Sequence, residues 1–198
     1  MNLPNKLTVS RFGLTALFLW SVFARSPLND TLALVLFCLA ALTDLFDGII
    51  ARRRGLITSF GMLMDPLADK ILVCSAFIAL VERGHMNPDS PVQVQAWMAV
   101  LIVARELAIT GLRLLAASKN VVLPAERFGK HKTIAQITAV IALLVLDAYT
   151  EWWPWLQGLF RPWAPTFTRW ALWVAVILTV TSGVQYLWRN RALYLQDL

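Results

Sequence analysis

The sequence predicts an all-α membrane protein with six transmembrane helices, built as one domain over residues 1–198. Hydrophobic residues make up 58% of the 198 residues, charged residues only 15%, and the mean hydropathy is +0.62. These values lie well outside those of soluble domains. Six apolar runs follow one another along the chain, each close to the roughly 20 residues that span a bilayer. So apolar a chain is a poor candidate for nucleic-acid binding, despite its net charge of +6.

The six runs leave no room for a separate soluble domain. They are Leu7 to Phe23, Thr31 to Ile50, Met62 to Val81, Val94 to Ala116, Thr133 to Tyr149 and Thr166 to Trp188. We expect the first run to stay as a helix, because no small-residue cleavage site of a signal peptide precedes Pro27. The last two runs contain mainly aliphatic and aromatic residues, so they are expected to serve as scaffold and interface.

The distribution of Lys and Arg predicts the orientation of the helices. One set of connections carries most of them: Lys6, Arg11, Arg52, Arg53, Arg54, Lys119, Arg127, Lys130, Lys132, Arg189 and Arg191. The opposite connections carry Arg25, Arg83, Arg161 and Arg169. Because positive charge favours the cytoplasmic side, both termini are expected in the cytoplasm. Most Trp residues then fall at the outer boundary, as an interfacial belt.

Two pairs of carboxylates stand out inside the apolar runs. Asp44 and Asp47 are three residues apart, and Asp65 and Asp69 are four apart, so each pair lies on one face of its own helix. Four clustered carboxylates need a cation to remain ionised together. Oxygen ligands without His or Cys suit Mg²⁺ or Mn²⁺, and two such ions can clamp a transferring phosphoryl group. The alternative is that the acids form ordinary ion pairs with nearby arginines.

The same stretch follows the pattern D-x2-D-G-x2-A-R-x8-G-x3-D-x3-D. The residues that meet it are Asp44, Asp47, Gly48, Ala51, Arg52, Gly61, Asp65 and Asp69. The pattern resembles the signature of the CDP-alcohol phosphatidyltransferases, integral membrane enzymes of phospholipid synthesis. By this resemblance, the four aspartates bind two metal ions that hold the diphosphate of CDP-diacylglycerol, and Asp69 is also the base.

The resemblance also implies a set of residues on the nucleotide side of the site. These are Asn5, Gly48, Ala51, Arg52, Thr58 and Gly61. Two of them have simpler interpretations, since Asn5 and Thr58 each suit the start of a helix. Arg52 extends the carboxylate stripe, and its guanidinium is suited to bidentate contact with a diphosphate.

The fourth run contains Arg105, Glu106 and Arg113, which leaves two cations with one acid inside a span. Excess positive charge inside a span needs an anion as its partner. Lys130 and Lys132 follow on the same side. A phosphate-bearing acceptor would meet that need. An internal Glu106–Arg113 salt bridge, seven residues apart, is the alternative. His131 has no paired acid or nucleophile at readable spacing and is expected on the surface.

Further segments indicate the acceptor. NLPNKLTVSR, DPLADK, RELAITGLRLLAA and GKHKT resemble the family members that transfer to glycerol 3-phosphate. The resemblance implies an enzyme of the bacterial cytoplasmic membrane, commonly a homodimer, in contact with membrane lipids. Other acceptors remain open: inositol phosphate, serine or phosphatidylglycerol. A divalent-cation transporter is the alternative from another class, although transporters bind near mid-membrane between related halves and no repeat is visible here.

Overall fold

The fold is described from a computed structural model of the chain. It describes the backbone of residues 3–24, 28–54, 59–119 and 128–195. Side chains are described for residues 9–24, 28–43, 70–119, 131–191 and 193–194.

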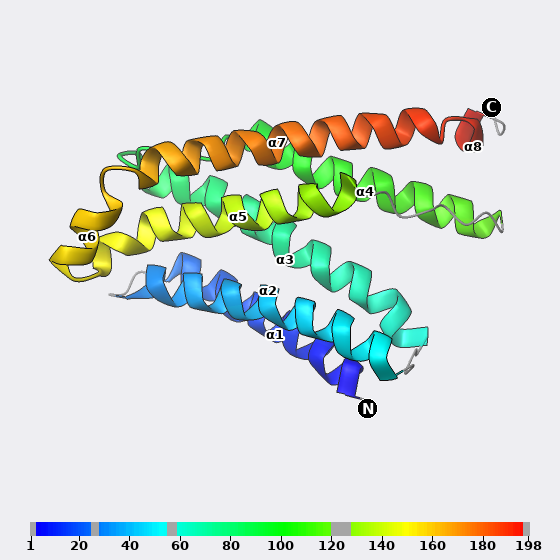
Figure 1. The fold of residues 1–198 in the computed structure, drawn as a ribbon, viewed down its shortest axis with the longest axis horizontal. Helices are drawn as coiled ribbons and strands as arrows, with labels where there is room; N and C mark the ends of the chain where they lie inside the picture. Colours follow the sequence, from blue (N-terminus) through cyan, green and yellow to red (C-terminus); the bar gives the residue numbers. More distant parts are fainter. Residues whose placement is uncertain (1–2, 25–27, 55–58, 120–127, 196–198) are drawn as a thin grey trace.

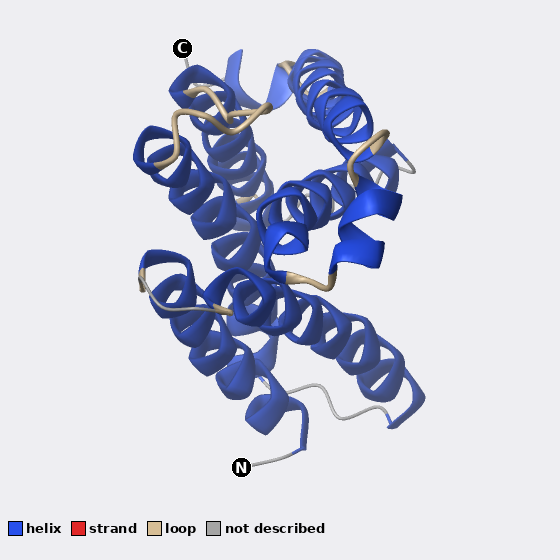
Figure 2. Cartoon of the chain, turned by 90° about the vertical axis from the view of Figure 1, so that its left-hand side faces the viewer, coloured by secondary structure: helices blue, strands red, loops and turns tan. Residues whose placement is uncertain are grey.

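Within those ranges the chain is helical, and no strand is present (Figure 2). The elements in order are α1 (Leu3–Phe23), α2 (Asn29–Arg54), α3 (Ser59–Met86), α4 (Ala96–Ser118), α5 (Phe128–Ala148), η1 (Tyr149–Glu151), α6 (Pro154–Phe160), α7 (Ala164–Arg189) and α8 (Ala192–Leu195). The predicted all-α class is confirmed. Each of the six apolar runs falls on one of the long helices, with ends that differ by a few residues.

The long helices run along the long axis of the molecule (Figure 1). Helix α1 packs on α2 and α3, α5 packs on α2, α3 and α7, and α4 lies between α3 and α7. The C-terminal ends of α2 and α4, the N-terminal ends of α3 and α5 and both ends of the chain lie toward one end, on the right in Figure 1. We call this the terminal end. The opposite end carries η1 and α6 and is called the α6 end.

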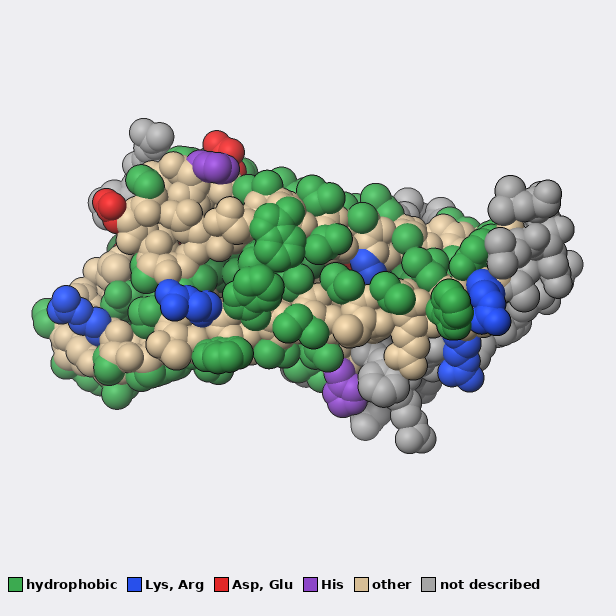
Figure 3. Space-filling view, turned by 90° about the horizontal axis from the view of Figure 1, so that it is seen from above, with side chains coloured by type: hydrophobic (Ala, Val, Ile, Leu, Met, Phe, Trp, Pro, Cys, Tyr) green, Lys and Arg blue, Asp and Glu red, His purple; other side chains and the backbone are tan. Residues whose placement is uncertain are grey.

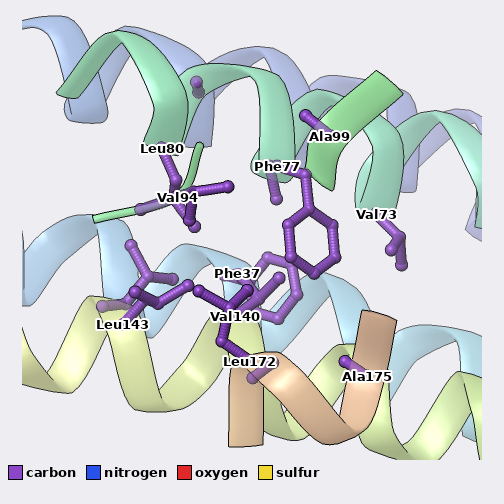
Figure 4. Close-up of a cluster of buried hydrophobic side chains, with 14 of the residues drawn as sticks. Phe37, Val73, Phe77, Leu80, Val94, Ala99, Val140, Leu143, Leu172 and Ala175 are labelled. Atoms are coloured by element: carbon purple, nitrogen blue, oxygen red, sulfur yellow. The ribbon is translucent and has the colours of Figure 1, made fainter. Parts of the chain in front are cut away.

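The core lies where helices from both halves of the chain meet. Phe37 of α2, Phe77 of α3, Val140 of α5 and Leu172 of α7 are almost completely buried and point toward one another (Figure 4). Phe37 also contacts Phe18 of α1, with ring centroids 5.5 Å apart. Close packing of this kind holds helices together even in lipid, where apolar burial alone provides no driving force.

Much of the outer surface is apolar. Val100 and Leu107 of α4, for example, expose 64% and 66% of their surface. On the face shown in Figure 3, apolar side chains cover much of the middle, and most of the charged side chains drawn lie toward the two ends. A large exposed apolar surface is typical of proteins covered by lipid or by a partner. Among the residues that the structure describes, His131–Glu151 and Ala164–Arg189 are long and apolar enough to cross a membrane.

Polar contacts tie the helices together at the α6 end. Glu151 accepts hydrogen bonds from the backbone N–H groups of Asp30 and Thr31, at 3.0 and 2.8 Å, so it caps the start of α2. Arg83 of α3 pairs with Asp30 and lies 4.0 Å from the carboxylate of Asp147. These contacts join α2, α3, α5 and η1 at the end opposite the aspartate motif.

Candidate active site

The aspartate motif is carried by α2 and α3, which pack on each other and run in opposite directions (Figure 1). Asp47 lies about 10 Å before the end of α2, and Asp65 about 9 Å after the start of α3, at 1.5 Å rise per residue. Asp44 and Asp69 each lie one turn farther from the connection. The backbone therefore places both acid pairs at similar heights near the terminal end. The four carboxylates themselves lie outside the described side chains, so their convergence stays a prediction.

Five of the six residues predicted for the nucleotide side occupy the same end. Asn5 is in α1, Gly48, Ala51 and Arg52 are in α2, and Gly61 is in α3. Their side chains lie outside the described part of the structure, and Thr58 lies outside it altogether. What the structure contributes is their placement on three neighbouring helices that pack together.

The predicted acceptor residues are partly brought together by Glu106 of α4. This carboxylate is 5% exposed and accepts a hydrogen bond from the ammonium group of Lys132 on α5, which is also 5% exposed. Arg105 is the second cation, with its Nη1 3.4 Å from Oε1 of Glu106. Two of the four predicted cations therefore meet at one carboxylate between α4 and α5.

Arg105 is held on a second side by α7. Its Nη2 donates to Oγ of Ser182 at 3.3 Å. A Cβ added at Gly183 would lie 2.7 Å from Cγ of Arg105, so α7 approaches the arginine stem this closely only because residue 183 is glycine. The buried Nε of Arg105 has no hydrogen-bond partner among the described groups. The guanidinium is thus held at Nη1 and Nη2, while its Nε–H makes no hydrogen bond to the described groups.

Arg113 lies two turns farther toward the terminal end. Its Nε donates to the hydroxyl of Tyr186 at 3.4 Å, and its guanidinium carbon is 5.7 Å from the centre of that ring. The salt bridge considered between Glu106 and Arg113 is not the pairing seen, since Glu106 contacts Lys132 and Arg105 instead. Lys130 is in α5, and its side chain lies outside the described residues. His131 is exposed, as expected.

Sequence reasoning missed the polar residues of α5 and α7 that border this cluster. Gln136 is 2% exposed and donates to Thr179 at 2.9 Å, while Ser182 and Tyr186 contact the two arginines of α4. The signal was available, because Ser182 and Tyr186 are four apart on one face of an otherwise apolar helix. Polar residues on one face of a membrane helix commonly mark a functional or packing surface.

Glu106, Arg105 and Lys132 together carry a net charge of +1, counted over these three described side chains. Charges removed from water need partners of opposite sign and good geometry. The arrangement is suited to receive an anion such as a phosphate. It lies on the helices beside those that carry the aspartate motif, because α3 packs on both α4 and α5.

Comparison with known proteins identifies the family. The profile of the CDP-alcohol phosphatidyltransferases matches residues 1–181. The chain belongs to the CDP-alcohol phosphatidyltransferase family. The family resemblance noted in the aspartate pattern is thereby confirmed.

Relatives within the CDP-alcohol phosphatidyltransferase family align over nearly the whole chain. A Bacillus subtilis protein named CDP-diacylglycerol–glycerol-3-phosphate 3-phosphatidyltransferase is 39% identical, over 96% of this chain and 95% of its own. A Rickettsia bellii protein of the same name is 35% identical, over 93% of each chain. A Mycobacterium tuberculosis protein named "Probable phosphatidylglycerophosphate synthase" is 38% identical, over 95% of this chain and 81% of its own.

Proposed function

We propose that this chain transfers the phosphatidyl group of CDP-diacylglycerol to glycerol 3-phosphate, which gives phosphatidylglycerol phosphate and CMP. The observation that carries the proposal is the similarity to relatives named for this reaction, at 35% and 39% identity over 93% and 96% of the chain. The complete aspartate pattern on α2 and α3 supports the same chemistry. The names of these relatives favour glycerol 3-phosphate over the other acceptors considered from the sequence.

Asp44, Asp47, Asp65 and Asp69 are the residues that would hold two Mg²⁺ or Mn²⁺ ions. Four carboxylates on two packed helices make an all-oxygen donor set, which fits these hard cations. When bound, the ions neutralise charge on the diphosphate and orient it. Asn5, Gly48, Ala51, Arg52, Thr58 and Gly61 line the nucleotide side, with the small residues leaving room for the substrate beside the helix backbones.

Asp69 is the proposed base. It accepts the proton of the primary hydroxyl of glycerol 3-phosphate while the hydroxyl oxygen forms its bond to the lipid-linked phosphorus. The bond from this phosphorus to the oxygen of CMP breaks, and CMP leaves with that electron pair. The protein's contribution is mainly positioning and charge neutralisation, as in other phosphoryl transfers.

The phosphate of the acceptor is bound by the cations of α4 and α5. The proposed residues are Arg105, Arg113, Lys130 and Lys132. The net positive charge around Glu106 and the unused Nε of Arg105 support this assignment. A charge-assisted hydrogen bond of this type is worth roughly 1.5 to 3 kcal/mol.

The proposed setting is the bacterial cytoplasmic membrane, with six spans and the active site facing the cytoplasm. The support is the six apolar runs, the bias of Lys and Arg toward one side, and the arrangement of both chain ends at the terminal end. Membrane lipids are then direct neighbours of the exposed apolar side chains. A homodimer is proposed from the family resemblance.

The test is release of CMP from CDP-diacylglycerol by purified protein in lipid–detergent micelles. The acceptors compared are glycerol 3-phosphate, inositol phosphate, serine and phosphatidylglycerol, each with and without Mg²⁺ or Mn²⁺. We expect metal-dependent release with glycerol 3-phosphate and little with the others. Preferred release with another acceptor would overturn the acceptor assignment, and no release with any acceptor would overturn the proposed reaction.

A further inference from the structure

Glu106 is an acid buried among the cations that are proposed to bind the acceptor. It lies on α4, contacts Lys132 of α5 and Arg105 of its own helix, and is 5% exposed. A buried ion pair is not in itself a strong source of stability, since the loss of hydration can exceed the attraction. A role in stability alone therefore explains this cluster poorly.

Glu106 contacts two long side chains and so restricts the conformations that they can adopt. Lysine has a flexible four-carbon stem, and fixing such a side chain costs about 0.5 to 1.5 kcal/mol when a ligand is bound. In this structure Lys132 is already fixed before the acceptor binds, because the carboxylate of Glu106 holds its ammonium group in place. Binding of the acceptor then does not have to fix this side chain. Arg105 is held between Glu106 and Ser182, with its Nε left as a donor.

We infer that Glu106 is a positioning residue that sets Lys132 and Arg105 in place for the phosphate of the acceptor. This inference rests on the proposed function and names how one part of that site is organised. Glu106 itself does not contact the substrate. Its carboxylate also reduces the repulsion between the two cations while the site lacks its acceptor, and the phosphate completes the charge balance when it binds.

The first experiment measures KM for both substrates in Glu106→Gln. The amide retains the size of the side chain but loses the negative charge that draws both cations to it. We expect KM for glycerol 3-phosphate to rise at least fivefold, with less than a twofold change in KM for CDP-diacylglycerol. A KM for glycerol 3-phosphate within twofold of wild type, or an equal rise for both substrates, would overturn the inference.

Thr168→Val is the matched control for general damage to the α5–α7 packing. Thr168 is 1% exposed on α7 and donates to the carbonyl of Ala142 on α5, at 3.2 Å, with no cation involved. The change keeps the shape of the side chain and removes one buried hydrogen bond. We expect a lower unfolding temperature with both KM values near wild type. A rise in KM for glycerol 3-phosphate equal to that of Glu106→Gln would show that loosened packing explains both.

A double-mutant cycle with Lys132→Gln separates positioning from stability. If Glu106 acts through Lys132, the fivefold effect of Glu106→Gln should fall below threefold when residue 132 is already glutamine. If the increases in KM for glycerol 3-phosphate of the two single variants multiply in the double variant, the inference is overturned. Where Glu106→Gln gives no folded protein, Glu106→Asp replaces it, with an expected rise of at least twofold in KM for glycerol 3-phosphate alone. Unchanged KM values in Glu106→Asp would count against the inference.

The acceptor assay on wild-type protein shows whether a negative result contradicts only the inference or also the proposed function. If wild-type protein uses glycerol 3-phosphate but Glu106→Gln leaves that KM unchanged, the inference alone fails. If wild-type protein uses only an acceptor without a phosphate, both fail, because no acceptor phosphate then needs to be positioned.

Discussion

Asp69 is the residue on which the proposed chemistry depends most, since it combines a metal-binding position with that of the base. Asp69→Asn keeps an oxygen at the site but removes the group that accepts a proton. We expect turnover to fall below a few per cent of wild type, while CDP-diacylglycerol still binds in the presence of metal. Equilibrium binding of the labelled lipid, measured beside CMP release, checks both parts. Activity above that level would remove Asp69 as the base.

Metal removal tests the carboxylate set as a whole. Hard oxygen ligands select Mg²⁺ or Mn²⁺, so EDTA should stop CMP release and either ion should restore it in wild-type protein. Asp44→Ala and Asp65→Ala remove one ligand from each helix, and we expect neither to recover with added metal. Activity that persists in EDTA would contradict the interpretation of all four aspartates.

Arg113 and Arg52 are assigned to different substrates in the proposed reaction, so their substitution should affect different KM values. Arg113→Ala removes a cation proposed to bind the acceptor phosphate, and we expect KM for glycerol 3-phosphate to rise about tenfold, which corresponds to 1.4 kcal/mol. Arg52→Ala should raise KM for CDP-diacylglycerol instead. Steady-state kinetics with each substrate varied in turn measure both.

Tyr186→Phe is the control for the contact of Arg113 with α7. It removes the hydroxyl that accepts from Nε of Arg113, at 3.4 Å, and keeps the ring beneath the guanidinium. If Arg113 serves only to hold α4 against α7, then Arg113→Ala and Tyr186→Phe should both lower stability without any acceptor-specific effect. That result would remove Arg113 from the phosphate site.

The sequence predicts candidate residues of the site but not the side-chain contacts between helices. The aspartate pattern is a local signal, because its spacing follows from helix geometry alone. The pairing of Glu106 with Lys132 was not predictable in the same way, since it joins residues 26 apart across two helices. Spacing along one helix made Arg113 a reasonable partner for Glu106, but in the structure Lys132 reaches Glu106 from α5 instead.

At the scale of elements, the apolar runs predicted the long helices and were less accurate for their ends. Helix α3 continues to Met86, past the predicted end at Val81. The extra turns carry Arg83, whose charge is matched by Asp30 of α2, a contact that the run of apolar residues does not reveal. Helix α6 was also not predicted. It starts at Pro154, whose fixed φ suits the first turn of a helix.

Glu151 provides a test of how the elements are joined at the α6 end. Its two backbone hydrogen bonds cap α2 from η1, and loss of a cap costs about 0.5 to 2 kcal/mol. We expect Glu151→Ala to lower the unfolding temperature of the protein in micelles, with KM for both substrates unchanged because the site lies at the other end. Glu82→Ala, an exposed acid on α3, is the control and should have little effect. A drop of the same size in Glu82→Ala would indicate a general charge effect.

At the scale of the whole molecule, the exposed fraction of a side chain does not show whether that side chain faces lipid or water. Val100 of α4 is 64% exposed and Trp155 of α6 is 68% exposed, yet the proposed topology places the first in lipid and the second at the outer boundary. The distinction between a position in lipid and one at the membrane boundary comes from hydropathy along the sequence, not from the geometry of the fold. The arrangement of helix ends in Figure 1 adds that the aspartate helices meet at the same end as both chain termini. The two kinds of information together support a proposed topology that labelling can test.

Single cysteines introduced after replacing Cys38 and Cys74 with alanine provide the test. In intact spheroplasts, a membrane-impermeant maleimide should label Trp155→Cys, because α6 is proposed to lie at the outer face. Arg191→Cys, at the terminal end, should be labelled only after the membrane is opened, since the positive-inside rule places it in the cytoplasm. Val100→Cys should resist labelling in both conditions, because thiols surrounded by hydrocarbon are rarely ionised and do not meet the reagent. The reverse pattern for positions 155 and 191 would place the aspartate site outside the cell, where a cytoplasmic supply of glycerol 3-phosphate does not reach it, and labelling at position 100 would mean that α4 is not a span.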